Sequence, residues 1–342
     1  MGKKDVMVFD IGGTYIRYNI LNEHLDVLED ISANKYRSPS FHRHPNFSGD
    51  ELVSALIDQI TKSFENIKKR NGALNVGGIG ISFPGPVNSK GTVRSAPPLW
   101  GDIIKNYPLK NKLESILPNK VFILNDVSAS CWYYKSKFPD KRFCVITVST
   151  GIGSKVFDMK HEDKIITLSN GLGGEIGHAS IECEEPSLVC DCGYKSHLGA
   201  IASGRGTEKY AKRYCINNLE EFSSSLLKKM TNNDPQKIDS FKIVQAFKEG
   251  DQLAINIITN TSRPLALMIQ QMYIVIGVEA FIITGGFALS LDKHYRKILI
   301  NHIKDIGIWG LKNHKIDRLI VLGDEGDEIN LKGIGKYVFS NL

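Results

Sequence analysis

Two glycine-rich turns in the sequence have the composition of phosphate-binding loops. They are Asp10-Ile11-Gly12-Gly13-Thr14 and Ser149-Thr150-Gly151-Ile152-Gly153. Glycines let backbone N–H groups approach an anion closely, because no Cβ blocks the way. Thr14 adds a hydroxyl donor, and Asp10 offers a carboxylate that Mg²⁺ can bind through water. One such turn alone is more simply a hairpin, but Thr284-Gly285-Gly286 after a third apolar run shifts the balance toward nucleotide binding.

Four potential metal ligands lie between residues 178 and 197. They are His178, Cys190, Cys192 and His197, in a glycine-rich stretch that reads as loop. Imidazole nitrogens and thiolates are ligands of tetrahedral Zn²⁺, and four protein ligands leave no position for an activated water. The predicted zinc is therefore structural. Cys183 is an alternative ligand, and the competing interpretation is a free Cys-x-Cys pair beside surface histidines.

Asp126 stands where a short apolar strand ends and a helix begins. A carboxylate in such a place can accept the proton of an attacking hydroxyl. Without further information, Asn125-Asp126 is more simply the N-cap of that helix.

Apolar periodicity predicts the elements that carry these residues. Strand, glycine turn and strand occur at 6–21 and again at 143–158, which predicts a repeated architecture with a phosphate-facing hairpin in each half. Lys155, after the second turn, is expected to be exposed. We expect an N-terminal α/β domain over residues 1–124, completed by a C-terminal helix over 331–342. The second α/β domain, with the zinc loop, is expected over 125–330.

Composition narrows the class of protein. A length of 342 residues favours two domains. The net charge of +6 comes from scattered basic residues without a cationic run, which disfavours nucleic acid as a partner. No apolar run is long enough to span a membrane. The absence of a secretory signal and the close spacing of Cys190 and Cys192 indicate a cytoplasmic protein.

Four motifs follow one another in a specific order. They are Phe9-Asp10-Ile11-Gly12-Gly13-Thr14, Gly80-Ile81-Ser82-Phe83-Pro84-Gly85-Pro86-Val87, Asn125-Asp126 and Gly174-Glu175-Ile176-Gly177-His178. In this order they resemble the ROK family (repressors, open reading frames and kinases of sugars). The resemblance spans residues 6–290. It implies an α/β, actin-like ATPase (ribonuclease H-like) fold, in which two α/β domains enclose a cleft.

The resemblance also implies an activity and a set of site residues. The chain is expected to be an ATP-dependent sugar kinase of the hexokinase and glucokinase kind, acting on a hexose or amino sugar with Mg-ATP. Asp126 would be the general base, and Asn125, Glu175 and His178 would bind the sugar. The nucleotide residues would be Asp10, Gly12, Gly13, Thr14, Thr150, Gly151, Gly153, Gly285 and Gly286. The family pattern of one His and three Cys places His197 at the third Cys position, and the family implies a homodimer.

Two positions depart from the family pattern. Pro98 stands where an asparagine is usual, and Gly199 stands where a glutamate is usual. A missing carboxylate at a buried sugar hydroxyl costs up to several kcal/mol if nothing replaces it. The preferred substrate is therefore expected to differ from plain glucose, with an amino, acylated or bulkier sugar as alternatives.

Two other functions compete with the kinase. A sugar-sensing repressor of the same family would carry a DNA-binding segment before the first motif, and because that motif begins at Phe9 a repressor is not expected. A catalytically silent sugar-binding protein is favoured by Pro98 and Gly199. Turnover of ATP distinguishes it from a kinase.

Overall fold

The chain folds into two compact units. In this computed structural model, residues 4–71, 75–101, 103–162, 164–181 and 188–342 are described. The first unit consists of Met1–Pro139, Ile165–Gly173 and Glu325–Leu342, and the second of Asp140–Lys164 and Gly174–Asp324. The first unit thus brings together the two ends of the sequence.

The first unit is built on a five-stranded sheet with the order β3-β2-β1-β4-β5. The pairs β1/β2 and β2/β3 are antiparallel, whereas β1/β4 and β4/β5 are parallel. The strands are β1 (Asp5–Ile11), β2 (Tyr15–Leu21), β3 (Lys35–Arg37), β4 (Val76–Phe83) and β5 (Val121–Asn125).

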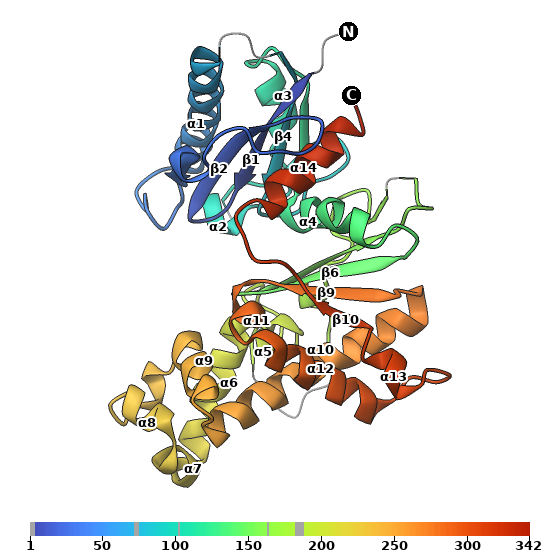
Figure 1. The fold of residues 1–342 in the computed structure, drawn as a ribbon. Coiled ribbons are helices and arrows are strands. Elements are labelled where there is room, and N and C mark those ends of the chain that lie inside the picture. The colour runs from blue at the N-terminus through green and yellow to red at the C-terminus, as the bar shows by residue number, and fades with distance from the viewer. Residues whose placement is uncertain (1–3, 72–74, 102, 163, 182–187) are drawn as a thin grey trace. The chain divides into compact units, whose positions relative to one another are not determined.

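Helices cover both faces of this sheet (Figure 1). The helices are α1 (Gly49–Arg70), α2 (Pro97–Trp100), α3 (Leu109–Glu114), α4 (Asp126–Tyr134) and α14 (Ile329–Phe339). Short 3₁₀ turns occur at η1 (Ser32–Asn34) and η2 (Lys135–Lys137), and the short strand β8 (Ile165–Ile166) lies in the segment 165–173.

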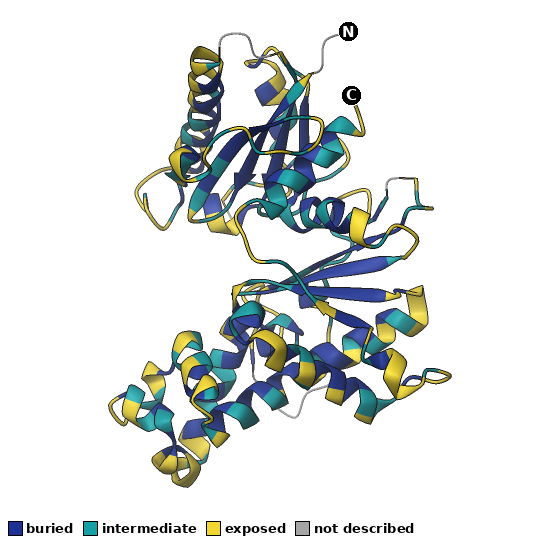
Figure 2. Cartoon of the chain, viewed as in Figure 1, coloured by how far each residue is buried: buried dark blue, intermediate teal, exposed yellow. Residues whose placement is uncertain are grey.

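Successive side chains of β1 point to opposite faces of the sheet, and each face forms a separate core. Met7 and Phe9 face the core shared with α1, whereas Val6 and Val8 face the core shared with α14. Figure 2 shows the central strands as buried. Helix α1 starts at a capping box, in which the Ser48 side chain accepts from the backbone N–H of Glu51.

The sheet of the second unit repeats this arrangement. Strands β10 (Ile320–Leu322), β9 (Ala280–Thr284), β6 (Phe143–Val148) and β7 (Ile152–Phe157) lie in that order. Strands β6 and β7 form an antiparallel hairpin, as β1 and β2 do in the first unit. Strand β6 also pairs in parallel with β9, as β1 does with β4. The repeated hairpin that the sequence predicted is confirmed.

Most of the second unit is helical. Its helices are α5 (Gly199–Ala202), α6 (Gly204–Asn217), α7 (Leu219–Ser224), α8 (Leu226–Met230), α9 (Ser240–Lys248), α10 (Gln252–Ile276), α11 (Gly286–Ser290), α12 (Asp292–Ile306) and α13 (Asn313–Ile316), with 3₁₀ turns η3 (Ile176–His178) and η4 (Pro235–Lys237). Helix α10 continues through Pro264 and buries one face. Among the described residues, no helix combines the length and the apolarity needed to cross a bilayer.

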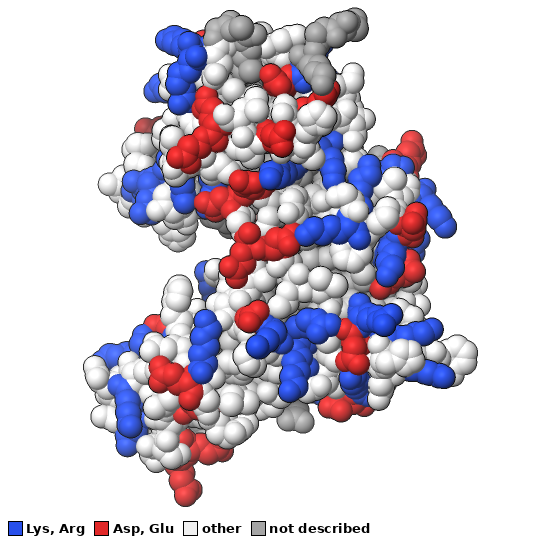
Figure 3. Space-filling view, viewed as in Figure 1, with Lys and Arg blue, Asp and Glu red and all other residues white. Residues whose placement is uncertain are grey.

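Charged side chains are mixed on the surface. On the face shown in Figure 3, acidic and basic groups are interspersed within each unit. This distribution fits the scattered basic residues of the sequence, and an extended cationic track of the kind that binds nucleic acid is not visible on that face.

Candidate nucleotide, sugar and metal sites

The first glycine turn joins β1 to β2 and is held closely by its neighbours. The backbone N–H of Gly12 donates to the carbonyl of Tyr15 at 2.8 Å. A Cβ added at Gly13 would lie 2.8 Å from the Cβ of Pro98, which is too close for any other residue type. Ser38 Oγ donates to the Gly12 carbonyl at 2.6 Å. Pro98, which departs from the family pattern, therefore packs directly on this turn.

Asp10 is buried at the end of β1, between partners on both neighbouring strands. Ser82 Oγ donates to Asp10 Oδ1 at 2.8 Å, and Asn330 Nδ2 donates to the same oxygen at 3.1 Å. The Arg17 guanidinium lies 3.6 Å from Oδ2. Burial outweighs these three contacts and raises the pKa of the Asp10 carboxyl. A cation bound here would reverse that shift, which fits a carboxylate that faces Mg²⁺.

Replacing Asp10 by asparagine is expected to stabilise the protein at neutral pH. Since the folded-state pKa of Asp10 lies above the unfolded value of 3.8, ionisation of this carboxyl opposes folding at pH 7. The gain in melting temperature of D10N should therefore be present at pH 7, measured in Mg²⁺-free buffer. It should shrink as the pH falls through the native pKa and vanish below the unfolded one.

Asp158→Asn is the matched control for this change. The backbone N–H of Lys160, and after it Arg142, lower the pKa of Asp158 in the second unit, although burial opposes them. A carboxyl whose pKa is lowered by folding stabilises the protein at pH values above its unfolded-state pKa. D158N should therefore lower the melting temperature at pH 7. A lower melting temperature for D10N as well would contradict the explanation by burial.

The predicted catalytic pair lies at the junction between β5 and α4. Asn125 Oδ1 accepts from the backbone N–H groups of Val127 and Ser128, at 3.0 and 3.3 Å, and caps the helix. Asn125 Nδ2 donates to the Gly85 carbonyl at 3.1 Å and to Asp126 Oδ1 at 2.9 Å. Asp126 is the first residue of α4, where the helix dipole stabilises its negative charge. Asn125 thus joins Asp126 to the Pro-Gly-Pro loop.

The second glycine turn borders a cavity of about 690 Å³ in the second unit. Thr150 and Gly286 both line it, together with basic side chains of α6, among them Lys212. Cavities of roughly 300–1,000 Å³ accommodate ligands of nucleotide size. Gly285 has a positional role, because its φ is +93° and an added Cβ would lie 2.5 Å from the Val148 carbonyl. Gly153 pairs with Thr147 within the hairpin, and Gly151 lies at its tip with no atom close to an added Cβ.

Glu175 is paired with a buried lysine. Lys155 Nζ lies 2.9 Å from Glu175 Oε1, and the Lys155 side chain is only 2% exposed. The expectation of an exposed Lys155 is therefore wrong. The chain places this side chain on the strand β7, beneath the loop that carries Glu175, where the carboxylate offsets the loss of hydration of the ammonium group.

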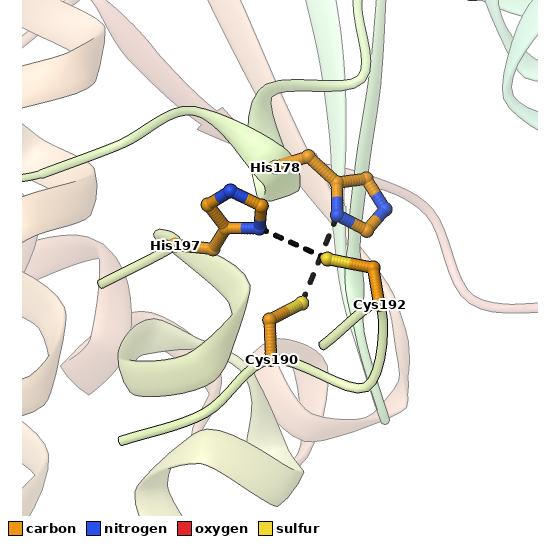
Figure 4. Close-up of side chains that lie close together, drawn as sticks. All are labelled: His178, Cys190, Cys192 and His197. Atoms are coloured by element: carbon orange, nitrogen blue, oxygen red, sulfur yellow. Dashed lines mark hydrogen bonds between the residues drawn. The ribbon is translucent and has the colours of Figure 1, made fainter. Parts of the chain in front are cut away.

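The four predicted metal ligands converge in one cluster (Figure 4). Their ligand atoms all lie within 4.8 Å of one another. Cys190 Sγ lies 3.7 Å from His178 Nδ1, and Cys192 Sγ lies 3.2 Å from His197 Nδ1. Ligand atoms around a tetrahedral zinc ion are separated by about 3.3–3.8 Å, from the usual Zn–N and Zn–S lengths. The donor set and its spacing therefore fit Zn²⁺, whereas Cys183 lies outside the described residues.

The residues that sequence analysis missed hold the predicted ones in place. Asp10 is directly opposite Arg17 on β2 and Ser82 on β4 in the strand register, a signal that strand pairing could have revealed. Asn330 lies 320 positions away from Asp10 in the sequence, so no local sequence pattern predicts their contact. Asp191, between the two metal cysteines, accepts hydrogen bonds from Arg205 and Lys209 of α6.

Comparison with known proteins assigns the chain to a family. The family model described as "ROK family" matches residues 6–319. The chain belongs to the ROK family. The four motifs that carried the resemblance all fall inside the matched range.

A similar ROK relative matches this chain over almost its whole length. The C(7)-cyclitol 7-kinase of Streptomyces hygroscopicus subsp. limoneus is 31% identical over 338 residues, which is 99% of this chain and 95% of the relative. The match therefore includes both units of this chain.

Solved structures of ROK proteins share the fold. The ROK hexokinase from Thermus thermophilus has a TM-score of 0.73 at 21% identity, covering 98% of this chain and 99% of that one. A ROK family transcriptional regulator, a homologue of the E. coli MLC protein, has a TM-score of 0.76 at 20% identity, and the match covers 98% of this chain and 77% of the regulator. The predicted α/β, actin-like ATPase fold is confirmed.

Proposed function

We propose that the chain is an ATP-dependent kinase of a polyhydroxylated ring, a sugar or a cyclitol. The observation that carries the proposal is the placement of Asp126 at the first position of α4, fixed by the capping residue Asn125. The similarity to a cyclitol kinase supports a ring polyol as the acceptor. Gly199 stands where the family usually has a glutamate, and the missing carboxylate fits an acceptor other than glucose.

The proposed reaction is in-line phosphoryl transfer. Asp126 accepts the proton of the acceptor hydroxyl as its oxygen bonds to the γ-phosphorus, and the bond from that phosphorus to the β-phosphate bridging oxygen breaks to release ADP. Asn125 acts mainly by orienting Asp126, since both of its amide hydrogens already have acceptors. Glu175 and His178 would bind substrate hydroxyls, with His178 doing so from its place in the metal cluster.

The nucleotide would bind to the glycine turns and the cavity of the second unit. Thr14 and the N–H group of Gly13 would contact phosphate, as would Thr150, Gly151 and Gly153. Gly12, whose own N–H donates to the Tyr15 carbonyl, would shape the turn. Gly285 and Gly286 would face the adenosine, and the largely exposed ring of Phe241 at the same cavity offers a stacking surface for adenine. When bound, Mg²⁺ supplies neutralisation of phosphate charge, and Asp10 would hold it through water.

Other parts of the proposal rest on the family resemblance. Zinc would be structural and would fix the loop that carries Glu175 and His178. By the family pattern the domains would be residues 1–124 with 331–342, and residues 125–330, whereas the compact units group residues 125–139 with the first unit. The assembly would be a homodimer.

Substrate-dependent release of ADP tests the proposed function. We expect one member of a panel of hexoses, N-acyl and free amino sugars and a C7 cyclitol to stimulate ADP release, with its phosphate ester detected by mass spectrometry. ATP without an acceptor is the control. If no acceptor stimulates release while a ligand of the panel still binds in calorimetry, the chain is a silent sugar-binding protein.

A further inference from the structure

Lys155 lies beneath Glu175 and contacts its carboxylate from inside the second unit. The Nζ–Oε1 distance is 2.9 Å, and the exposed fractions of the two side chains are 2% and 26%. Glu175 is therefore the member of the pair that reaches the surface. The Lys155 ammonium and the Glu175 carboxylate form an ion pair, and the pair as a whole carries no net charge.

The backbone below Glu175 is fixed by contacts that do not involve the lysine side chain. Ser154 Oγ donates to the Gly174 carbonyl at 2.7 Å. Cβ atoms added at Gly174 and Gly177 would lie 2.6 Å and 2.2 Å from the carbonyls of Ser154 and Ile152. The loop thus lies directly against β7. Removal of the Lys155 charge should therefore leave the loop in place. It should leave the negative charge of Glu175 no longer compensated by Lys155.

The other described acid of this loop is already paired with cations. Among the described residues of the segment 174–199, the acids are Glu175 and Asp191. Asp191 is paired with Arg205 and Lys209 of α6. Zinc bound by two thiolates and two neutral imidazoles would carry no net charge. No described carboxylate of this segment is therefore left to attract a cationic substrate.

From this ion pair we infer that Lys155 is a positioning residue that selects substrates by charge. The inference rests on the proposed function, since it takes Glu175 as a substrate ligand. With its charge compensated by Lys155, Glu175 accepts a hydrogen bond from the hydroxyl of a neutral polyol. It gains little from a substrate ammonium group, which must lose its hydration and lies close to a second ammonium. The substrate class is a neutral polyhydroxylated ring, and free amino sugars are disfavoured.

Calorimetric dissociation constants for two matched pairs of ligands test this inference. The pairs are glucose with glucosamine and mannose with mannosamine, each measured at pH 7 with and without ATP analogue. Wild type should bind the neutral member more tightly. Lys155→Met removes the ammonium with little change in side-chain length, and should shift the ratio of dissociation constants toward the ammonium ligand by about tenfold or more, the size of a lost or gained charged hydrogen bond.

Two further variants separate charge selection from damage to the fold. Lys155→Met/Glu175→Gln has no charge in the pair and should recover the wild-type preference for the neutral ligand. Lys164→Met, at a lysine that donates to the Met159 carbonyl, should leave the ratio unchanged. An unchanged ratio in Lys155→Met for both pairs would overturn the inference, as would tighter binding of the ammonium ligands by wild type. Since these ratios come from binding, they can hold or fail whether or not ADP is released.

Discussion

Asp126→Asn is expected to lower kcat by about 10²–10⁴-fold, the usual contribution of a general base. Asp126 Oδ1 accepts from the backbone N–H of Val127 at 2.8 Å, and an asparagine can keep an oxygen in that place. What the variant loses is the ability to accept a proton from the acceptor hydroxyl. KM for ATP and the melting temperature should therefore change little. Steady-state ADP release and thermal unfolding monitored by circular dichroism measure the two effects.

Asp50→Asn provides the matched control for this variant. Asp50 lies exposed in the first turn of α1, in the same unit, and loses the same interaction with a helix N-terminus, about 0.3–1 kcal/mol. Its kcat should equal that of wild type. If D126N keeps more than a small fraction of wild-type turnover, the acceptor hydroxyl is deprotonated by another group, and the proposed role of Asp126 is wrong.

Cys192→Ser is expected to abolish zinc binding and to destabilise the second unit. The cluster joins η3 to the segment that leads into α5, because His178 and His197 lie on either side of the two cysteines. Loss of one thiolate from a four-ligand site should reduce bound zinc from about one ion per chain to nearly none. Structural zinc contributes free energy of folding directly, so the melting temperature should fall. Metal analysis and thermal unfolding of the same samples check both effects.

Cys183→Ser and His197→Ala decide which residue is the fourth ligand. The geometry of the described residues favours His197, whose Nδ1 lies 3.2 Å from Cys192 Sγ. We expect H197A to lose zinc and C183S to retain it. The opposite outcome would replace His197 by Cys183 in the ligand set, and retention of zinc by Cys192→Ser would reject the site itself.

The sequence predicted best those features that depend on neighbouring residues. The glycine turn after β1 and the junction at Asn125-Asp126 both arise from backbone preferences within a few positions. The four metal ligands lie within a short loop, so their spacing alone restricts how far apart they can be. These features were therefore available from local patterns.

Contacts between distant segments were not available in the same way. The burial of Lys155 depends on a loop about twenty positions later folding back over β7. The contact of Asn330 with Asp10 needs the last helix to pack on the first strand. A lysine after a hairpin is usually solvated, and only the position of Glu175 shows that this one is not. Such contacts follow from strand register and helix packing, which single-residue patterns do not encode.

Helix α14 has a consequence for the order of events at the ribosome. It covers Val6 and Val8 of the first strand, and Gly333 packs so closely on the Ala129 carbonyl that an added Cβ would lie 1.9 Å from it. This face of the N-terminal sheet stays uncovered until translation has passed residue 338. The residues of the second unit, which end at Asp324, leave the ribosome earlier. We therefore expect the second unit to complete its fold during synthesis before the first unit can.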